Sequence, residues 1–240
     1  MKTLAVIPAR YASTRLPGKP LIPVGGIPLV IRVLDNVRKC RKVDRVIVAA
    51  DDERIAEVVL REGGEVMMTP AELPSGGDRV AWAAERTPSD YVINVQVDDP
   101  LVGSDMIDPL VEALDSDNDV SLALLAKKIE RREEIDSPDI VKMVFDTKGR
   151  ALYFSRSPIP YPRTRQGIWY KHIGPYAWRR SFLLDFSKWE QTPLEKRESL
   201  EMLRVLERGH SIRCIMTERD TIEIDTPNDL TRIGKYLSEP

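Results

Sequence analysis

Short apolar runs rich in β-branched residues alternate along the chain with stretches whose apolar residues recur at helical spacing. The runs predict strands at 4–7, 45–50, 91–97, 120–126 and 212–216. The stretches between several of them predict helices at 27–38, 55–61, 79–86 and 106–114. Strand, helix and strand in this order are typical of a parallel sheet, and continuous apolar runs indicate strands buried on both faces. The pattern therefore predicts an α/β fold with a mixed, mostly parallel sheet flanked by helices.

The middle of the chain follows a different pattern. Between about 140 and 180, prolines interrupt short strand-like pieces and aromatic residues are concentrated, which indicates antiparallel strands in a lobe or insertion. We expect a single domain over 1–240, with a smaller antiparallel lobe at about 120–190. Regular structure then resumes with a predicted helix at 194–207, a strand around 212, and a last helix near Pro227, for which Thr226 is the expected N-cap.

The composition is that of a soluble globular protein, with 42% apolar and 31% charged residues among 240. Because the formal net charge is −2, no broad positive field is available to hold nucleic acid or an anionic membrane surface. No apolar run is long enough to span a bilayer, and Met1 is taken as the start of the mature fold. The two cysteines are too few for a disulfide framework or a four-cysteine zinc site, which predicts a cytoplasmic protein.

Ligands of such sheets bind beyond the carboxyl ends of the strands, so we look for chemistry after residues 7, 50 and 97. The loop 8–20 lies at the first of these places and carries hydroxyls, backbone amides and three cations, which are Arg10, Arg15 and Lys19. This combination suits a triphosphate. The loop is not a Walker motif, because that motif requires glycine in place of Ser13 and serine or threonine in place of Pro20. A solvated basic loop is the alternative.

Acidic residues follow two of the predicted strands. Asp98 and Asp99 come directly after the run 91–97, so their carboxylates are expected at the ligand edge of the sheet. Magnesium takes oxygen ligands, commonly one or two carboxylates with phosphate oxygens and water. Asp225, just before the last predicted helix, is the candidate for a second carboxylate. Each of these aspartates is also explained as a cap or turn residue.

The segment Ser75–Gly76–Gly77–Asp78–Arg79 predicts a tight loop that opens a helix, with Asp78 near the helix N-terminus. Its glycines would let the backbone approach a flat base, and Arg79 could bind a carboxylate or a phosphate. An ordinary glycine turn with a capping aspartate is the alternative. Further along, Pro158 holds the backbone before it extended, so Arg156 and Ser157 have defined directions.

Together these segments resemble the sugar-acid cytidylyltransferases. The likeness covers nearly the whole chain, through the segments 7–21, 51–54, 63–66, 75–79, 95–100, 151–161, 171–174, 198–201, 203–207 and 225–227. The segment 155–161, which reads Ser-Arg-Ser-Pro-Ile-Pro-Tyr, is highly specific. The resemblance implies a Rossmann-like nucleotidyltransferase fold.

It also implies a reaction in which the anomeric hydroxyl of a 3-deoxy-octulosonic acid attacks the α-phosphorus of CTP. The products are pyrophosphate and a CMP-sugar for lipopolysaccharide synthesis. Catalytic roles are implied for Arg10, Lys19, Asp98 and Asp225, and the two aspartates would bind Mg²⁺. The residues implied to bind CTP are Pro8, Ala9, Arg10, Arg15, Lys19, Pro74, Ser75, Gly76, Asp78 and Gln96.

The resemblance further implies a sugar-acid pocket and a homodimer built from the middle lobe. The pocket residues are Arg79, Gln96, Arg156, Ser157, His172, Tyr176 and Glu198. His172 is alternatively a packed polar residue. Glutamates on a helix are mostly solvated, so of Glu195, Glu198 and Glu201 we keep only Glu198 as a site residue.

Three positions depart from the family pattern. Val97, Asp99 and Gly77 stand where glycine, glutamate and threonine are usual. They leave open an amino-substituted sugar, such as 8-amino-3,8-dideoxy-octulosonate, or a nonulosonic acid. A non-catalytic nucleotide sensor is the alternative from another class, but a sensor could lose the metal carboxylates that this chain keeps. A metal-dependent phosphohydrolase would need more ligands than two histidines supply.

Overall fold

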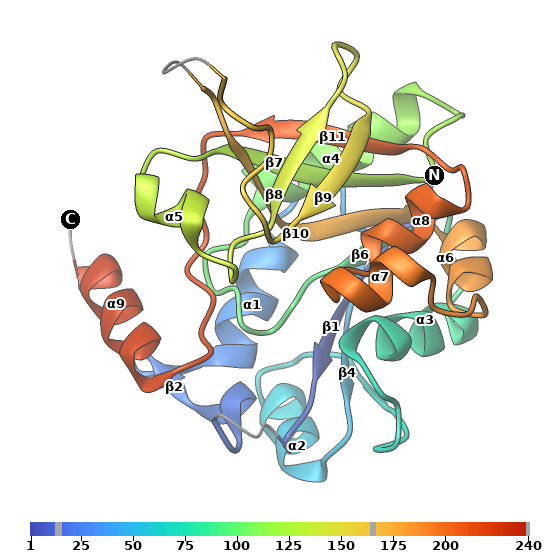
Figure 1. Cartoon of the computed structure of the whole chain (residues 1–240). Helices are drawn as coiled ribbons and strands as arrows, with labels where there is room; N and C mark the ends of the chain where they lie inside the picture. The colour runs from blue at the N-terminus through green and yellow to red at the C-terminus, as the bar shows by residue number, and fades with distance from the viewer. Residues whose placement is uncertain (13–15, 164–166, 239–240) are drawn as a thin grey trace.

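One large mixed sheet forms the centre of the computed structural model, which describes residues 1–12, 16–163 and 167–238 (Figure 1). Its strands lie in the order β11–β7–β10–β6–β1–β4–β5. In the same order, their bounds are Ile212–Thr217, Leu122–Lys128, Tyr170–Arg179, Tyr91–Asn94, Thr3–Ala9, Arg45–Ala50 and Val66–Met68. β6, β1, β4 and β5 are parallel neighbours, whereas β10 is antiparallel to β6 and β7. This confirms the predicted α/β fold with a mixed sheet.

The predicted antiparallel region is also present. β8 (Lys142–Phe145) and β9 (Ala151–Ser155) form a hairpin that pairs with β10. A short two-stranded sheet lies apart from the main one, formed by β2 (Pro23–Val24) and β3 (Ile27–Pro28). Figure 1 shows the β8–β9 hairpin projecting from the sheet.

Helices cover both faces of the sheet. Along β1, Ala5 and Ile7 pack into one apolar cluster while Leu4 and Val6 pack into the other, as the two-residue period of a strand requires. The first cluster is covered by α1 (Leu29–Arg38), α2 (Glu53–Arg61), α4 (Ser104–Ser116) and α9 (Pro227–Ser238). The second is covered by α3 (Gly76–Arg86), α6 (Arg180–Phe186) and α8 (Met202–Glu207), and α7 (Pro193–Glu198) packs against α8. Two short helices, η1 (Lys19–Leu21) and α5 (Arg132–Asp136), lie in connections.

Several predicted boundaries differ from the structure by two or three residues, and two of the differences bear on the site. β6 ends at Asn94 instead of 97, because the chain turns after Gln96, whose carbonyl accepts a hydrogen bond from Asp99 N. The helix predicted at 194–207 is two helices, α7 and α8. They are separated at Ser199, which has φ 54° and ψ 48° and is the one positive-φ residue other than glycine in the described part of the chain. Its left-handed backbone ends α7.

Among the described residues, no helix is both long enough and apolar enough to cross a bilayer. Both cysteines are buried and unpaired.

Candidate active site

The parallel strands β1, β4 and β6 end at one edge of the sheet. Three of the four residues predicted to be catalytic follow β1 and β6 there: Arg10, Lys19 and Asp98. The triphosphate loop, by which we mean residues 8–20, leaves β1 there, and Asp51 follows β4. Tyr11 anchors the loop: its backbone N–H donates to Asp51 Oδ1 at 2.9 Å, and the Arg54 guanidinium lies 3.4 Å from its ring centroid. Gly18, with φ 69°, returns the chain toward Tyr11. Arg15 lies outside the described residues.

Lys19 joins two acids that are far apart in the sequence. Its Nζ donates to Asp98 Oδ2 at 2.7 Å and to Asp225 Oδ1 at 3.0 Å, and its side chain is only 11% exposed. Burial alone would lower the pKa of Lys19, but the charges and hydrogen bonds of the two aspartates outweigh burial and raise it. The structure therefore brings together three of the four residues predicted to be catalytic.

This arrangement fits a divalent cation. Two carboxylates converge on one positive centre, the Lys19 ammonium, and carboxylate oxygens are the donors that magnesium prefers. In the described part of the chain, no group of three or more His, Cys, Asp or Glu side chains has a metal-binding arrangement. Phosphate oxygens of a nucleotide and water would therefore have to complete the coordination.

Two further carboxyls gather at the same place. Asp99 is buried, and burial raises its pKa to about 7, although its carboxylate accepts a hydrogen bond from Leu101 N. Burial also raises the pKa of Glu223, and the charges of Asp98 and Asp225 add to this effect. The sequence analysis did not select Glu223, because nothing in its local pattern distinguishes it from a solvated glutamate. The local excess of acids favours a positive charge at this place.

The loop 74–79 closes one side of the site. Ser75 caps α3: its hydroxyl accepts from Asp78 N at 3.0 Å and donates to Asp78 Oδ2. A β-carbon on Gly76 would lie 3.0 Å from Gln96 Oε1 and 3.4 Å from Pro8, so only glycine packs here without displacing a neighbour. Arg10 reaches across to the Pro74 carbonyl. The residues predicted to bind CTP thus come together at one edge, apart from Arg15.

Arg79 has a different place from the one predicted. Its side chain is fully buried, and its guanidinium contacts Asp51 Oδ2, the Thr69 hydroxyl and the Pro70 carbonyl. The expectation that it binds the sugar acid was therefore wrong, because no surface of its side chain is accessible. Since Asp51 also accepts from Tyr11 N, the pair links the triphosphate loop to α3.

Replacing Asp51 by asparagine should destabilise the protein by up to about 3 kcal/mol, because it leaves the buried Arg79 cation without its counter-charge. Urea unfolding followed by circular dichroism measures this. The neighbouring Asp52→Asn is the matched control: Asp52 caps α2 from a more exposed position, and asparagine caps equally well, so stability should stay near that of the wild type. Equal stability of the two variants would contradict a structural role for the Asp51–Arg79 pair.

His172 and Tyr176 lie on the sheet, with Asp98 and Glu223 among the charged neighbours of Tyr176. Both belong to β10, with ring centroids 5.1 Å apart and planes 17° from parallel, and the Phe154 ring packs edge-on against His172. Burial lowers the pKa of His172 to about 4, so the imidazole is neutral at physiological pH. Its Nε2 has no hydrogen-bond partner among the described residues. Burial, followed by the charges of Glu201, Glu223 and Asp98, raises the pKa of Tyr176.

Glu198 and Arg156 face each other instead of a cavity. Glu198 accepts hydrogen bonds from the Ser155 hydroxyl at 2.7 Å and from Arg156 N at 2.9 Å, so each carboxylate oxygen has a protein donor. The Arg156 guanidinium donates to the carbonyls of Glu198 and Pro138. Ser157 is exposed at the same corner. Both oxygens thus hold this corner of the fold, and Glu198 as a sugar contact stays a prediction.

Glu201, unlike Glu198, lines a cavity. The cavity has a volume of about 600 Å³ and lies between α3 and the α6–α8 helices, with Ser75, Gly77, Asp78 and Asn94 also in its lining. A β-carbon on Gly77 would lie only 3.3 Å from Glu201 Oε2, so glycine gives this carboxyl room. In one continuous helix, residues 198 and 201 would share a face; the left-handed Ser199 separates them. This break in the helix distinguishes the two glutamates. Helical spacing in the sequence does not reveal it.

Burial raises the pKa of the Glu201 carboxyl to about 7, with Arg204, Glu195 and Asp78 as its charged neighbours. Between pH 4.5 and 7 the unfolded chain releases a proton that the folded protein keeps, so the wild type loses stability as the pH rises. Glu201→Gln should therefore melt at a higher temperature than the wild type at about pH 8, and the advantage should vanish near pH 4.5. A melting-temperature difference independent of pH would show that Glu201 ionises normally.

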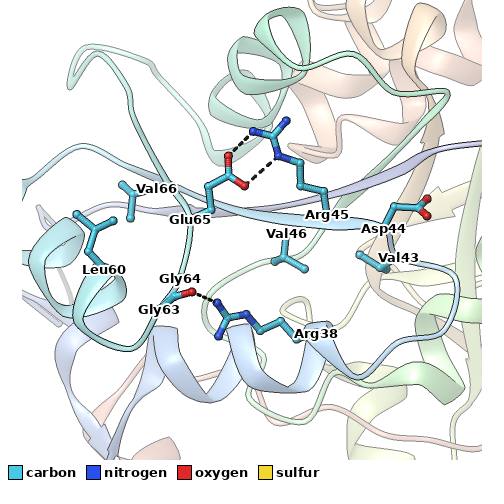
Figure 2. A pocket seen from close by; sticks show the side chains of 10 residues that line it. All are labelled: Arg38, Val43, Asp44, Arg45, Val46, Leu60, Gly63, Gly64, Glu65 and Val66. Carbon is cyan, nitrogen blue, oxygen red and sulfur yellow. Dashed lines mark hydrogen bonds and ion pairs between the residues drawn. The ribbon is translucent and has the colours of Figure 1, made fainter.

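A second cavity, of about 510 Å³, lies at the opposite edge of the sheet, where β4 and β5 begin (Figure 2). An ion pair between Arg45 and Glu65 lies on one side of it. Arg38 donates to the Gly63 carbonyl on the other side. The charged groups there are paired with the protein itself, and none of the predicted site residues is among the lining.

The chain belongs to the cytidylyltransferase family, whose model, described as "Cytidylyltransferase", matches residues 4–212. It is thus a nucleotidyltransferase enzyme. It is 45% identical to the 3-deoxy-manno-octulosonate cytidylyltransferase of Geobacter metallireducens, over 99% of this chain and 98% of that protein. It is 46% identical to the protein of the same name from Desulfosudis oleivorans, with the same coverage. These relatives confirm the resemblance seen in the sequence.

Two solved structures match the fold of this chain. The structure of CMP:2-keto-3-deoxy-manno-octonic acid synthetase complexed with CTP matches with a TM-score of 0.95 and 37% identity, over 99% of both chains. The 4-diphosphocytidyl-2C-methyl-D-erythritol synthase of Anaerococcus prevotii shares the fold at a TM-score of 0.66, 16% identity and 99% coverage of both chains. The nucleotidyltransferase fold is therefore confirmed.

Proposed function

We propose that this enzyme transfers CMP from CTP to the anomeric hydroxyl of 3-deoxy-D-manno-octulosonate and releases pyrophosphate. The observation that carries the proposal is the convergence of Lys19, Asp98 and Asp225 at the carboxyl edge of the sheet. On either side of this centre lie the loop 74–79 and the His172–Tyr176 pair. Relatives of 45% and 46% identity are named for this sugar acid, which supports the choice of substrate.

CTP would bind along the edge formed by the triphosphate loop and the loop 74–79. Arg10 and Lys19 would neutralise the triphosphate and the departing pyrophosphate, with Arg15 as a further proposed ligand. The cytosine would lie against the backbone near Gly76, between Pro8 and Gln96, where the absence of a side chain permits close approach. The remaining proposed CTP contacts are Ala9, Pro74, Ser75 and Asp78.

Asp98 and Asp225 would hold Mg²⁺ when the nucleotide binds. The ion would supply charge neutralisation at the phosphates and a lower pKa for a hydroxyl that joins its coordination shell. The protein's own contribution is placement: Ile224 N donates to the Asp98 carbonyl at 2.9 Å, which ties the segment before Asp225 to Asp98. The backbone N–H of Asp225 donates to Asp229 in the first turn of α9. Both acids are thereby held before any cation arrives.

The sugar acid would lie on the His172 and Tyr176 side of the site. A neutral His172, with Nε2 unpartnered in the described residues, can hydrogen-bond a sugar hydroxyl without adding charge. Glu201, in the adjoining cavity, is a second proposed contact for hydroxyl groups. Gln96, whose amide donates to Asn94 Oδ1, lies between the two substrates. Catalysis would rest on orientation and charge neutralisation, with no separate general base.

We also propose that the enzyme is a cytoplasmic homodimer formed through the middle lobe. Exposed apolar side chains gather in that part of the sequence, with Leu152 60% exposed, Tyr161 86% and Ile168 55%. Both cysteines are free thiols, in keeping with a reducing compartment. Sedimentation at micromolar concentration tests the dimer, and a monomer there would contradict it.

Pyrophosphate release tests the function. The enzyme is given CTP with 3-deoxy-D-manno-octulosonate, with 8-amino-3,8-dideoxy-octulosonate or with a nonulosonic acid, each with and without Mg²⁺. Release that requires both the octulosonate and Mg²⁺ is expected. Release only with one of the other sugars would change the substrate, and release without any sugar would indicate a phosphohydrolase. CTP binding with no release would indicate a nucleotide sensor.

A further inference from the structure

Lys142 is a fully buried lysine in which all three ammonium hydrogens point to backbone carbonyls. Its Nζ donates to Ser137 O at 2.8 Å, to Ile140 O at 2.7 Å and to Arg156 O. It makes no salt bridge in the described part of the chain, and it does not line either cavity. A lysine that is sealed from solvent and directed only at carbonyls organises backbone and does not act on a substrate.

The three carbonyls belong to two segments that meet at Lys142. Two are in the turn 137–140, before β8, and the third is at Arg156, just after β9. Arg156 continues the connection: its Nε donates to Glu198 O at 2.8 Å, and its Nη2 approaches Ser199 O at 3.5 Å. These carbonyls end α7, where a helix leaves acceptors without partners. The chain of contacts thus runs from Lys142 through Arg156 to Ser199.

Ser199 is where this connection affects the cavity. Its left-handed backbone, with φ 54° and ψ 48°, is unfavourable for a residue with a β-carbon, so surrounding contacts must hold it. The turn it makes starts α8 in a new direction and places Glu201 in the wall of the cavity beside Gly77 and Asp78. Without the turn, Glu201 would follow Glu198 on one helix face.

We propose that Lys142 is a positioning residue for the sugar-acid site, holding Arg156 so that the Ser199 turn directs Glu201 into the cavity. This rests on the proposed function and deepens it, because it separates the binding of the sugar acid from that of CTP. The contacts of the triphosphate loop, made by Lys19 and Asp51, involve none of the Lys142 network. The expected signature is therefore selective for one substrate.

Lys142→Met tests the proposal, because methionine is similar in length and has no donors. We expect the KM for the sugar acid to rise by about tenfold or more, while the KM for CTP stays within about twofold of the wild type. Lys127→Met is the matched control, since Lys127 is also a buried strand lysine but pairs with Glu130 and Glu218. It should lower the melting temperature without the selective rise.

Two variants at Ser199 keep the test decisive even where Lys142→Met folds poorly. Ser199→Val leaves Lys142 in place but makes the left-handed turn much harder to adopt, so it should give the same selective rise in the sugar-acid KM. Ser199→Gly should restore part of the loss in Lys142→Met, since glycine adopts this backbone without support.

Wild-type kinetics in both Lys142→Met and Ser199→Val would overturn the proposal, as would equal rises in both KM values or the same selective rise in Lys127→Met. The wild-type enzyme is the reference for the function itself. If it releases no pyrophosphate from CTP and the sugar acid, the proposed function fails. If it turns over and the variants match it, only the role of Lys142 fails.

Discussion

Asp98→Asn should lower the turnover of the enzyme by about a thousandfold while leaving the fold in place. Asparagine keeps the shape of the side chain and can still accept the hydrogen bond from Lys19 Nζ, but it removes one of the two charges that converge on that point. The backbone contact between Asp98 O and Ile224 N is unaffected by the change. Loss of activity should therefore come without loss of structure.

The stability of this variant is informative because Asp98 lies among like charges. Its charge contributes to the raised pKa values of Asp99 and Glu223, so its removal relieves repulsion. At the same time, Lys19 loses one of its two charged partners. These effects oppose each other, and we expect the melting temperature to stay within about 3 °C of the wild type. An active site that concentrates acids is typical of a place where function is kept at the expense of stability.

Pyrophosphate release at saturating CTP and sugar acid measures the turnover, and thermal melting of the same sample measures the fold. Asp105→Asn is the matched control, because Asp105 is an exposed aspartate in the first turn of α4 with a single long contact to Arg219. It should keep wild-type turnover. Activity of Asp98→Asn within about tenfold of the wild type would remove Asp98 from the catalytic centre.

The sequence predicts the edge of the sheet that carries the chemistry more reliably than the direction of each side chain. Arg10, Asp98 and Gln96 lie at the expected edge because they follow strands that are recognisable as apolar runs, and parallel strands end together. The contact of Lys19 with Asp98 and Asp225 spans 79 and 206 positions and depends on the packing of the whole sheet. No local pattern contains it.

The wrong predictions have one physical origin. An arginine after Gly-Gly-Asp is equally compatible with binding an anion and with a buried ion pair, and only the position of Asp51 decides for Arg79. Glu198 and Glu201 were assigned on the assumption of an unbroken helix, which Ser199 interrupts without a glycine to announce it. In both cases, contacts between distant parts of the chain decide the structure, and the local sequence pattern does not contain them.

Lys19→Met should lower turnover by at least about a hundredfold and raise the KM for CTP, because it removes the cation that Asp98 and Asp225 share. Methionine fills similar space, so the fold should persist. The two carboxylates then repel each other across a short distance without a positive charge between them. For this reason, added Mg²⁺ should raise the melting temperature of Lys19→Met more than that of the wild type, although the variant is less active.

This combination distinguishes a lysine that acts on the nucleotide from one that only neutralises acids. A purely structural lysine would be replaced in full by Mg²⁺, so Lys19→Met would regain activity as the ion concentration increases. A lysine that also binds the triphosphate would not be replaced, and the high KM for CTP would persist at every Mg²⁺ concentration. We expect the second result. Lys39→Met, at an exposed lysine after α1, is the control and should match the wild type in both measurements. An unchanged turnover and CTP KM in Lys19→Met would show that the ammonium takes no part in the transfer.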